Sequence, residues 1–517
     1  MCLIKGSEVK WLGSREFKCN ARRTTFFHLY NRMLLKILLG FLCGAAARQG
    51  PPPLLLVSFD GFRADYLQRF PMPNLKLLYS QGVLVEELTS VFVTKTFPNH
   101  YTLVTGLYTE SHGIVANIMY DPVSKSYFQV GKNNTPWWWE EAEPLWITAL
   151  DSGYKTAGVM WPGSELAIRN RTPTYFCPYD SDVTFQQRVE LVTKWIQGDE
   201  KEEGVMFAAL YWEEPDRSGH FYGPDNTTAM AKVLKEVDDN IGLLVSELKR
   251  TGLWGHINVL IVSDHGMSQC SAERLIQLDD CIHPDSYTLV DLAPVTAIIP
   301  HSDPKTMVDL LNECHAHITA YLKEDIPERF HYRNNIRIQP IIVVADDGWT
   351  IVQHGNVLPH LGMHGYDNAL PSMHPFMAAT GPSFHQGYSR SSLNSVDIYP
   401  LMCHLLSVPP QPNNGTLTHA RCLLASESCW DDGMSVRLIL GLLLALTIVA
   451  IVFRLVCRRR QSEPVRLRAR VEEEPLILDG SMEADHDRIW LTGRQAALNN
   501  QQPRLSGNNS LFRCLKT

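Results

Sequence analysis

Carboxylate and imidazole side chains stand at the ends of several short apolar runs of this chain, where they could bind metal ions together. The run LLLVSF, for example, is followed directly by Asp60. Asp216 and the pair Asp264 and His265 also stand at such ends. His220 follows Asp216 by four residues, and His364 lies in MHGYDN, which completes the set. Carboxylates and imidazoles in combination suit Zn²⁺, and Mn²⁺ is the less favoured ion.

Three aspartates and three histidines are too many ligands for a single tetrahedral zinc ion. They suit two ions, each with three protein ligands and one open position. Two metal ions about 3.5–4 Å apart can stabilise both the attacking and the leaving oxygen of a phosphoryl displacement. The cations would also offset the repulsion among neighbouring aspartates. We therefore expect two Zn²⁺ ions and phosphoryl-transfer chemistry.

A hydroxyl nucleophile for this chemistry is present in TKTFPNH, where Thr96 precedes Phe97 and Pro98. Proline biases the residue before it away from helix. The following NHYTLVTGL can form a helix, whose N-terminus favours a phosphate group. A metal ion can activate the hydroxyl without a neighbouring base. Thr96 could equally be a helix cap, and the stretch alone leaves both interpretations open.

Strand-like and helical patterns alternate along the chain, which predicts an α/β fold. Apolar runs without polar alternation, such as INVLIVS before Asp264, are typical of strands buried on both faces of a mainly parallel sheet. Helical stretches separate them, and in residues 226–253 apolar residues recur three and four apart. Ligands of open parallel sheets bind beyond the carboxyl ends of the strands, where Asp60 would lie.

Two apolar segments predict export and membrane anchoring. Residues 33–48 are typical of a signal peptide, although a retained signal anchor would also fit. Residues 438–457 are long enough to cross a bilayer. Acidic residues precede this span and arginines follow it, so the body would lie outside a single-pass type I protein of the plasma membrane. A net charge of −8 argues against a nucleic-acid partner.

These segments and the shifts in composition divide the chain into six regions. They are an unexplained N-terminal extension (1–32), the signal peptide (33–48), a catalytic domain (51–410), an extracellular stalk (411–437), the transmembrane helix (438–457) and a disordered cytoplasmic tail (458–517). Within the tail, EEEPLI (Glu472–Ile477) resembles an acidic dileucine signal. A sorting adaptor that bound it would cycle the protein through endosomes or lysosomes.

Export also favours disulfides and glycans. The number of cysteines between the two apolar segments is odd. Their spacing favours a pair Cys422–Cys429 and next a pair Cys281–Cys314, although spacing alone does not fix connectivity. Sequons for exposed N-linked glycans occur at Asn133, Asn170, Asn226 and Asn414.

Several ordered segments together resemble the ectonucleotide pyrophosphatase/phosphodiesterase family. They are SFDGFR, TKTFPNHYTLVTGLY, LYWEEPDRSGH, SDHGM and HGYDN, and the likeness spans about residues 51–430. It implies an alkaline-phosphatase-like fold without the cysteine-rich and nuclease-like domains of larger relatives. The resemblance also implies that one Zn²⁺ is held by Asp216, His220 and His364, and the other by Asp60, Asp264 and His265, with Thr96 Oγ between them.

The resemblance further implies roles at the substrate. Thr96 would attack the phosphorus and form a nucleotidylated threonine, from which water would release a nucleoside 5′-monophosphate. Asn117 would donate a hydrogen bond to a phosphate oxygen, and Phe97 and Tyr179 would sandwich the base. Without the family, Asn117 would be a turn residue and the two rings core residues. The implied substrates are diadenosine triphosphate and ATP.

Three other functions stay open. A phospholipid or choline-phosphodiester hydrolase of the same family would need an apolar or choline-binding pocket where Phe97 and Tyr179 lie. An alkaline phosphatase or a sulfatase would use a serine, or a nucleophile derived from cysteine or serine, where this chain has Thr96. A receptor-like ectodomain could keep the fold with little turnover, although all the proposed ligands are present.

Overall fold

A mainly parallel sheet of nine strands forms the centre of the computed structural model, which describes residues 50–132, 134–354, 360–427, 440–449, 451–452, 455 and 515–516. From edge to edge the strands are β18 (Tyr388–Asn394), β2 (Gly82–Thr89), β17 (Met377–Thr380), β8 (Asn258–Val262), β1 (Leu54–Phe59), β7 (Phe207–Trp212), β5 (Thr156–Val159), β6 (Tyr175–Cys177) and β19 (Leu515–Lys516). Only β17 and β19 pair antiparallel within this sheet.

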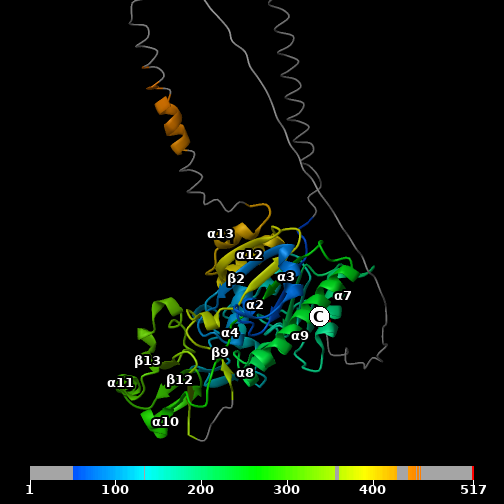
Figure 1. Ribbon diagram of the computed structural model, residues 1–517. Coiled ribbons are helices and arrows are strands. Elements are labelled where there is room, and N and C mark those ends of the chain that lie inside the picture. The colour runs from blue at the N-terminus through cyan, green and yellow to red at the C-terminus, as the bar shows by residue number, and fades with distance from the viewer. Residues whose placement is uncertain are drawn as a thin grey trace, which may run out of the picture. The chain divides into compact units, whose positions relative to one another are not determined.

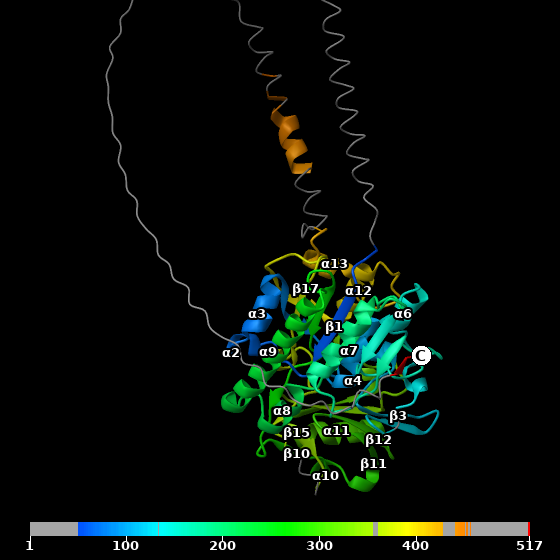
Figure 2. The ribbon, with the colours of Figure 1, turned by 90° about the vertical axis from the view of Figure 1, so that its right-hand side faces the viewer.

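Helices cover both faces of this sheet (Figure 1, Figure 2). One face carries α3 (Pro73–Ser80), α7 (Phe185–Gln197) and α9 (Thr227–Arg250), and the other carries α4 (Thr96–Thr105), α6 (Leu145–Asp151) and α12 (Ile398–Leu406). The central strand β1 shows why its sequence lacks polar residues. Leu54 and Leu56 enter the apolar core on one face, whereas Leu55 and Val57 enter the core on the other. The predicted α/β fold is confirmed.

The long helix α9 lies close to the predicted range 226–253. Asn226 caps its start, because the side-chain Oδ1 accepts a hydrogen bond from Ala229 N at 3.1 Å. Its buried residues, such as Leu234 and Ile241, recur at helical spacing and pack into the core that α7 shares.

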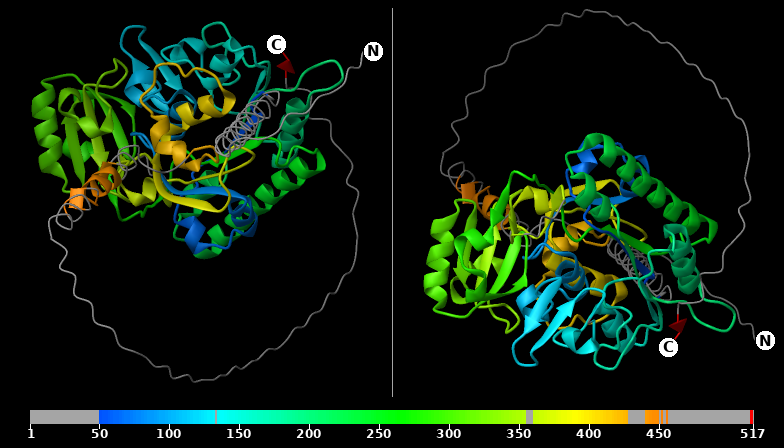
Figure 3. Two further views of the ribbon diagram at one scale, coloured as in Figure 1. Left: turned by 90° about the horizontal axis from the view of Figure 1, so that it is seen from above. Right: turned by 90° about the horizontal axis from the view of Figure 1, so that it is seen from below.

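A smaller antiparallel sheet is inserted in the chain between β8 and β17, and it lies beside the main sheet (Figure 3). Its strands, in order, are β11 (Tyr287–Asp291), β12 (Val295–Pro300), β14 (Ile341–Ala345) and β13 (Ile318–Leu322). A disulfide joins Cys281 at the end of α10 (Leu278–Cys281) to Cys314 at the end of α11 (Pro304–Cys314). Cys429, the predicted partner of Cys422, lies outside the described residues.

Short elements complete the body. The two-stranded sheets are β3 (Ile118–Asp121) with β4 (Ser126–Gln129), β9 (Ser268–Gln269) with β16 (Gly362–Met363), and β10 (Leu275–Gln277) with β15 (Thr350–Val352). The short helices are α2 (Tyr66–Arg69), α5 (Thr109–His112), α8 (Asp216–Tyr222) and α13 (Leu417–Ala420).

The globular body extends beyond residue 410, where the sequence analysis placed the start of the stalk. Helix α13 packs on the body, and Ala420, Leu423 and Leu424 belong to the same buried cluster as the core of α12. The Pro, Asn and Gly content of the preceding stretch concealed this apolar segment. The predicted boundary between domain and stalk was therefore too early.

The terminal regions are described only in part. The predicted extension (1–32) and signal peptide (33–48) lie outside the described residues. Residues 440–449 of the predicted span are helical, but no helix within the described parts of the chain is long and apolar enough to cross a membrane. The tail was predicted to be disordered, yet its residues Leu515–Lys516 pair with β6. The unpaired backbone groups of an edge strand explain why such an addition is possible.

Candidate active site

The carboxyl ends of three neighbouring strands bring the predicted acidic residues to one edge of the main sheet. Asp60 follows β1, and Asp264 follows β8, the parallel neighbour of β1. Asp216 begins α8 just after β7, which pairs with β1 on its other side. Parallel neighbours end at the same edge, so residues far apart in the sequence meet there.

The first cluster consists of Asp60, Asp264 and His265, all of which are buried. His265 Nε2 lies 3.3 Å from Asp60 Oδ1 and 3.1 Å from Asp264 Oδ2. The three ligand atoms lie within 4.8 Å of one another, close enough to share one cation. The structure therefore brings together the three residues assigned to one metal ion by the family resemblance.

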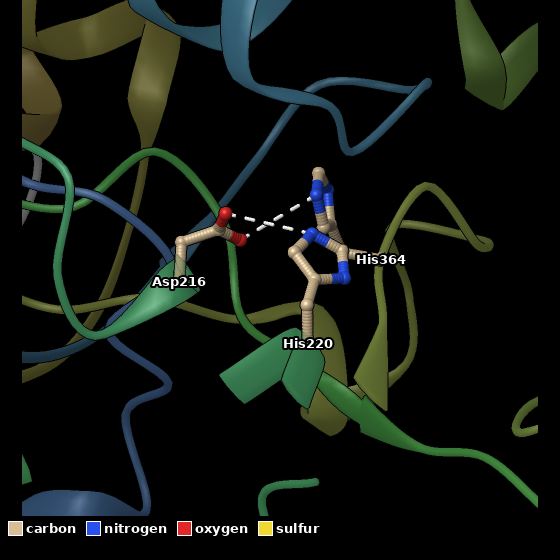
Figure 4. A group of neighbouring side chains, drawn as sticks. All are labelled: Asp216, His220 and His364. Atoms are coloured by element: carbon tan, nitrogen blue, oxygen red, sulfur yellow. Dashed lines mark ion pairs between the residues drawn. The ribbon is translucent and has the colours of Figure 1, made fainter. Parts of the chain in front are cut away.

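The second cluster consists of Asp216, His220 and His364 (Figure 4). Asp216 and His220 lie one turn apart on α8, and His364 follows β16. The two oxygens of Asp216 face the two imidazoles: Oδ2 lies 3.4 Å from His220 Nε2, and Oδ1 lies 3.5 Å from His364 Nε2. The clusters adjoin, because the rings of His265 and His364 stack with centroids 3.6 Å apart.

Backbone carbonyls fix the tautomer of all three histidines. The Nδ1 atoms of His265, His220 and His364 each lie 2.8 Å from a carbonyl oxygen, of Gly266, Gly362 and Thr94 respectively. A carbonyl only accepts, so each Nδ1 carries the proton and each Nε2 keeps its lone pair for the cluster. Metal-binding histidines are commonly oriented in this way.

Carboxylate oxygens in both clusters fit a cation. Asp60 Oδ1, Asp216 Oδ1 and Asp264 Oδ2 are buried and have no hydrogen-bond partner in the described residues. A buried acceptor without a partner is costly, and a bound cation removes that cost. The donor set of carboxylate oxygens and imidazole nitrogens suits Zn²⁺ in tetrahedral sites that keep an open position.

Burial strongly perturbs the pKa values of these groups in the metal-free chain. Burial and the neighbouring carboxylates raise the pKa of Asp60 to about 7, and burial likewise raises that of Asp216 to about 7. Burial alone would lower the pKa of His265, but Asp264 and Asp60 raise it to about 10. The pKa of Asp264 is lowered despite its burial, because His265 and His100 lie beside it.

These shifts predict that added metal stabilises the protein more in alkali than near neutrality. The pKa values of Asp60, Asp216 and His265 are raised in the folded state. Such a group contributes to the free energy of unfolding at low pH, and this contribution is lost as the pH rises through the raised pKa. The metal-free protein should therefore melt at a lower temperature at about pH 9 than at about pH 6.5. Zn²⁺ neutralises the carboxylates, and its binding displaces protons.

Thermal melts of chelated and zinc-loaded protein at the two pH values measure this effect. The increase in melting temperature on adding Zn²⁺ should be larger at the higher pH. An equal increase at both pH values, with saturating metal, would contradict the prediction. Calcium, which prefers oxygen ligands in larger numbers, serves as the control ion.

Thr96 is the first residue of α4, and its hydroxyl faces the two clusters. Thr96 Oγ1 lies 3.3 Å from His265 Nε2. The residue at the cap position is Lys95, and no side chain caps this helix, so Thr96 does not serve as a helix cap. The hydroxyl therefore stands at a helix N-terminus beside two adjoining clusters, where an anion would be favoured.

A cavity of about 530 Å³ opens at this hydroxyl and has room for a nucleotide. Asp60, Asp216 and Thr96 line it, together with the predicted substrate residues Phe97, Asn117 and Tyr179. Asn117 Oδ1 accepts a hydrogen bond from Phe97 N at 3.0 Å, which directs the donor Nδ2 elsewhere. Tyr179 is 55 % exposed, so part of its ring surface is open to stacking by a base.

Sequence reasoning missed two side chains that support the clusters. Tyr211 donates its hydroxyl proton to Asp60 Oδ2 at 2.6 Å, but its place within an apolar run gave no sign of this role. His100 Nδ1 donates to Thr96 O at 2.8 Å and lies 3.2 Å from Asp264 Oδ2. Its spacing of four residues from Thr96 on one helix could have indicated the contact.

Two adjoining carboxylate–histidine clusters and a threonine hydroxyl, on an alkaline-phosphatase-like α/β fold, define a hydrolase of phosphate esters. Residues 54–367 match the family described as type I phosphodiesterase / nucleotide pyrophosphatase. The chain belongs to this family and is a hydrolase of phosphodiester or pyrophosphate bonds. The family resemblance stated from the motifs is confirmed.

Curated relatives and solved structures agree with this placement. A bis(5′-adenosyl)-triphosphatase of Xenopus laevis is 51% identical over 82% of this chain and 94% of its own length, and that of Homo sapiens is 52% identical over 80% and 91%. The human family member 5 is 47% identical over 72% of this chain and 78% of its own length. The structure of an inactive threonine-to-alanine variant of murine member 5 with AMP matches with a TM-score of 0.70 and 43% identity, covering 72% of this chain and all of that chain.

Proposed function

We propose that this protein hydrolyses dinucleoside polyphosphates such as diadenosine triphosphate, and also ATP, to a nucleoside 5′-monophosphate. The observation that carries the proposal is the Thr96 hydroxyl, 3.3 Å from His265 Nε2 at the mouth of a cavity lined by Phe97 and Tyr179. Relatives about half identical to this chain are named for the cleavage of bis(5′-adenosyl) triphosphate. The enzyme name of these relatives and the geometry of the cavity support the same substrate.

In the proposed mechanism Thr96 Oγ attacks the phosphorus next to one nucleoside. A phosphoester bond forms to Thr96, the bond to the remaining nucleotide breaks, and that nucleotide leaves. Water then attacks the nucleotidylated threonine, releases the 5′-monophosphate and restores the hydroxyl. Asn117 Nδ2 donates to a phosphate oxygen throughout, while Phe97 and Tyr179 hold the base. This positioning converts a slow bimolecular reaction into an intramolecular one.

Two Zn²⁺ ions complete the proposed site. Asp216, His220 and His364 would hold one ion, and Asp60, Asp264 and His265 the other. The ions supply positive charge that lowers the pKa of the attacking hydroxyl and neutralises the phosphate. The protein keeps each imidazole in the ligand tautomer through its carbonyl partner.

Product analysis tests the proposal. The full chain, made in a secreting cell, is expected to convert diadenosine triphosphate to AMP and ADP. Lysophosphatidylcholine and phosphocholine esters serve as competing substrates. Turnover of these lipids without turnover of the dinucleotide would replace the proposed substrate by the lipid class of the same family. No turnover of any phosphodiester would favour a receptor-like ectodomain.

Base stacking predicts the effect of the two aromatic residues. Replacing Phe97 or Tyr179 by alanine removes a ring worth about 1–3 kcal/mol of stacking, so KM for diadenosine triphosphate should rise about 5- to 100-fold. Phe97→Tyr and Tyr179→Phe keep a ring and serve as controls with nearly normal KM. Steady-state kinetics with adenine and uracil nucleotides measure the effect. An unchanged KM in both alanine variants would place the base elsewhere.

We also propose that the catalytic domain faces the outside of the cell, anchored by residues 438–457, with Glu472–Ile477 available to a sorting adaptor. The apolar span, with its arginines on one side, supports this topology. Asn170, Asn226 and Asn414 are exposed, as acceptors for glycans must be, and Asn133 lies outside the described residues. In this topology residues 515–516 and β6 would lie on opposite sides of the membrane, so the pairing of β19 with β6 in the structure is an observation against it.

Epitope tags test the topology. A tag after residue 517 should be protected from antibody on intact cells, whereas a tag at residue 51 should be accessible. Glycosidase should reduce the apparent mass of the protein. Surface labelling of the C-terminal tag would contradict the anchored topology and would agree with the pairing of β19 and β6.

A further inference from the structure

A buried ion pair links the residue before the nucleophile to the small sheet. Lys95 Nζ donates to Asp291 Oδ2 at 2.5 Å, and the two side chains are only 7% and 8% exposed. Lys95 directly precedes α4, whereas Asp291 ends β11. Asp291 is also held from its own side, because Leu292 N donates to its Oδ1 at 2.9 Å. The pair therefore joins the start of α4, next to Thr96, to the small sheet.

The backbone that Lys95 anchors sets the geometry of a metal ligand as well as the nucleophile. Thr94 O accepts a hydrogen bond from His364 Nδ1 at 2.8 Å. Thr94 Oγ1 donates to Tyr366 O at 2.9 Å and accepts from Gly365 N at 3.0 Å. A shift of this short segment would move the hydroxyl of Thr96 and the ring of His364 together.

The side chain of Lys95 lies close to the backbone at Gly365. Gly365 has a φ of +118°, and a Cβ at this position would lie 3.2 Å from Lys95 Cε and 3.1 Å from Pro294 Cδ. The backbone after His364 can approach the lysine stem this closely only because residue 365 is glycine. Gly365 therefore leaves room for the lysine side chain that reaches Asp291.

A contribution to the stability of the fold is a poor explanation for the presence of the Lys95–Asp291 pair. Burial raises the pKa of Asp291 even though the Lys95 ammonium lies beside it, so the attraction does not fully offset the loss of hydration. Buried ion pairs can often be replaced by apolar side chains of similar volume with no loss of stability. A pair retained at such a place is better explained by the geometry that it enforces.

We propose that Lys95 and Asp291 are positioning residues, which hold the Thr94–Thr96 backbone so that the Thr96 hydroxyl stays aligned with the phosphorus. The inference rests on the proposed function, because it assumes that Thr96 is the nucleophile. It predicts a loss of turnover rather than of substrate binding, since Phe97 and Tyr179 line the cavity whereas Lys95 and Asp291 do not.

The test compares three variants of the full chain. Asp291→Asn and Lys95→Met each remove one charge, and the double variant Lys95→Met/Asp291→Leu replaces the pair by apolar side chains. Each single variant should lower kcat about 10- to 100-fold, with KM within about 3-fold of normal. The double variant should regain the normal melting temperature but not the normal kcat. A double variant with normal kcat would overturn the inference.

A matched substitution elsewhere separates positioning from stability. Asp238 on α9 is equally buried, and its carboxylate accepts hydrogen bonds from Asn74 N and Leu75 N at 3.0 and 2.9 Å. Asp238→Asn should lower the melting temperature while kcat stays within about 2-fold of normal. An equal loss of kcat in Asp238→Asn and Asp291→Asn would also overturn the inference.

A second substrate keeps this test separate from the proposed function. Bis(4-nitrophenyl) phosphate is a phosphodiester without a nucleoside, and its cleavage still requires an aligned nucleophile. If the unmodified chain cleaves it but not diadenosine triphosphate, the proposed substrate fails and the positioning test continues with this ester. If Asp291→Asn cleaves bis(4-nitrophenyl) phosphate and diadenosine triphosphate at the normal rates, the positioning role fails while the proposed function stands.

Discussion

Replacement of Thr96 by alanine should lower kcat for diadenosine triphosphate by at least about 10³-fold, because the covalent route loses its nucleophile. The change should leave the fold intact. Thr96 is partly exposed at the start of α4, and its side chain neither caps the helix nor fills a core. Melting temperature and zinc content should therefore stay near normal while turnover is lost.

Acid quenching gives a direct measurement of the covalent step. A radiolabelled adenylyl group should remain on the unmodified chain, and peptide mapping should place it at Thr96. Thr96→Ser keeps a hydroxyl and should retain partial turnover and labelling, so it is the matched control. Normal turnover in Thr96→Ala, or a label on another residue, would rule out the mechanism.

Removal of metal should abolish turnover as completely as the loss of Thr96. The clusters place three carboxylates and three imidazoles around the hydroxyl, and in the metal-free protein the pKa of His265 is raised to about 10. Without metal, His265 lies in ion pairs with Asp60 and Asp264, and no cation is present to lower the pKa of the attacking hydroxyl. We expect chelated protein to lose at least about 10³-fold in kcat.

Reconstitution and elemental analysis measure this effect. Activity should return on adding Zn²⁺, with close to two ions per active chain. His364→Gln should lose one ion and most of the activity, because its cluster lacks one imidazole. The control is His374→Gln, because His374 contacts Glu87 and belongs to neither cluster. This variant should keep both ions and the normal activity. Active, correctly folded protein without transition metal would exclude this chemistry.

The ligand set could be predicted because each residue follows an element that the sequence marks clearly. Asp60 and Asp264 end apolar runs that are buried on both faces, and parallel strands leave their carboxyl ends at one edge. Asp216 and His220 lie one helical turn apart. His364 belonged to the predicted set, but it returns to the site only after the inserted small sheet, so its assignment to the cluster of Asp216 and His220 came from the family resemblance.

Contacts that depend on tertiary packing could not be predicted. Tyr211 lies in an apolar strand, and no local pattern reveals that its hydroxyl contacts Asp60. Lys95 and Asp291 are distant in sequence, and one precedes a helix whereas the other ends a strand, so neither indicates the other. The packing of Leu423 and Leu424 was missed because the stretch before them has the composition of a loop. Local propensity does not determine such contacts.

The inserted small sheet separates the contributors to the metal centre along the chain, with Asp264 and His265 before it and His364 after it. During synthesis, a ribosome therefore releases most of the α/β body before the final imidazole emerges. A nascent or truncated chain that ends within the insertion lacks a complete centre, whatever else has folded. The complete set of six side chains is therefore present only after the chain beyond the insertion has been made.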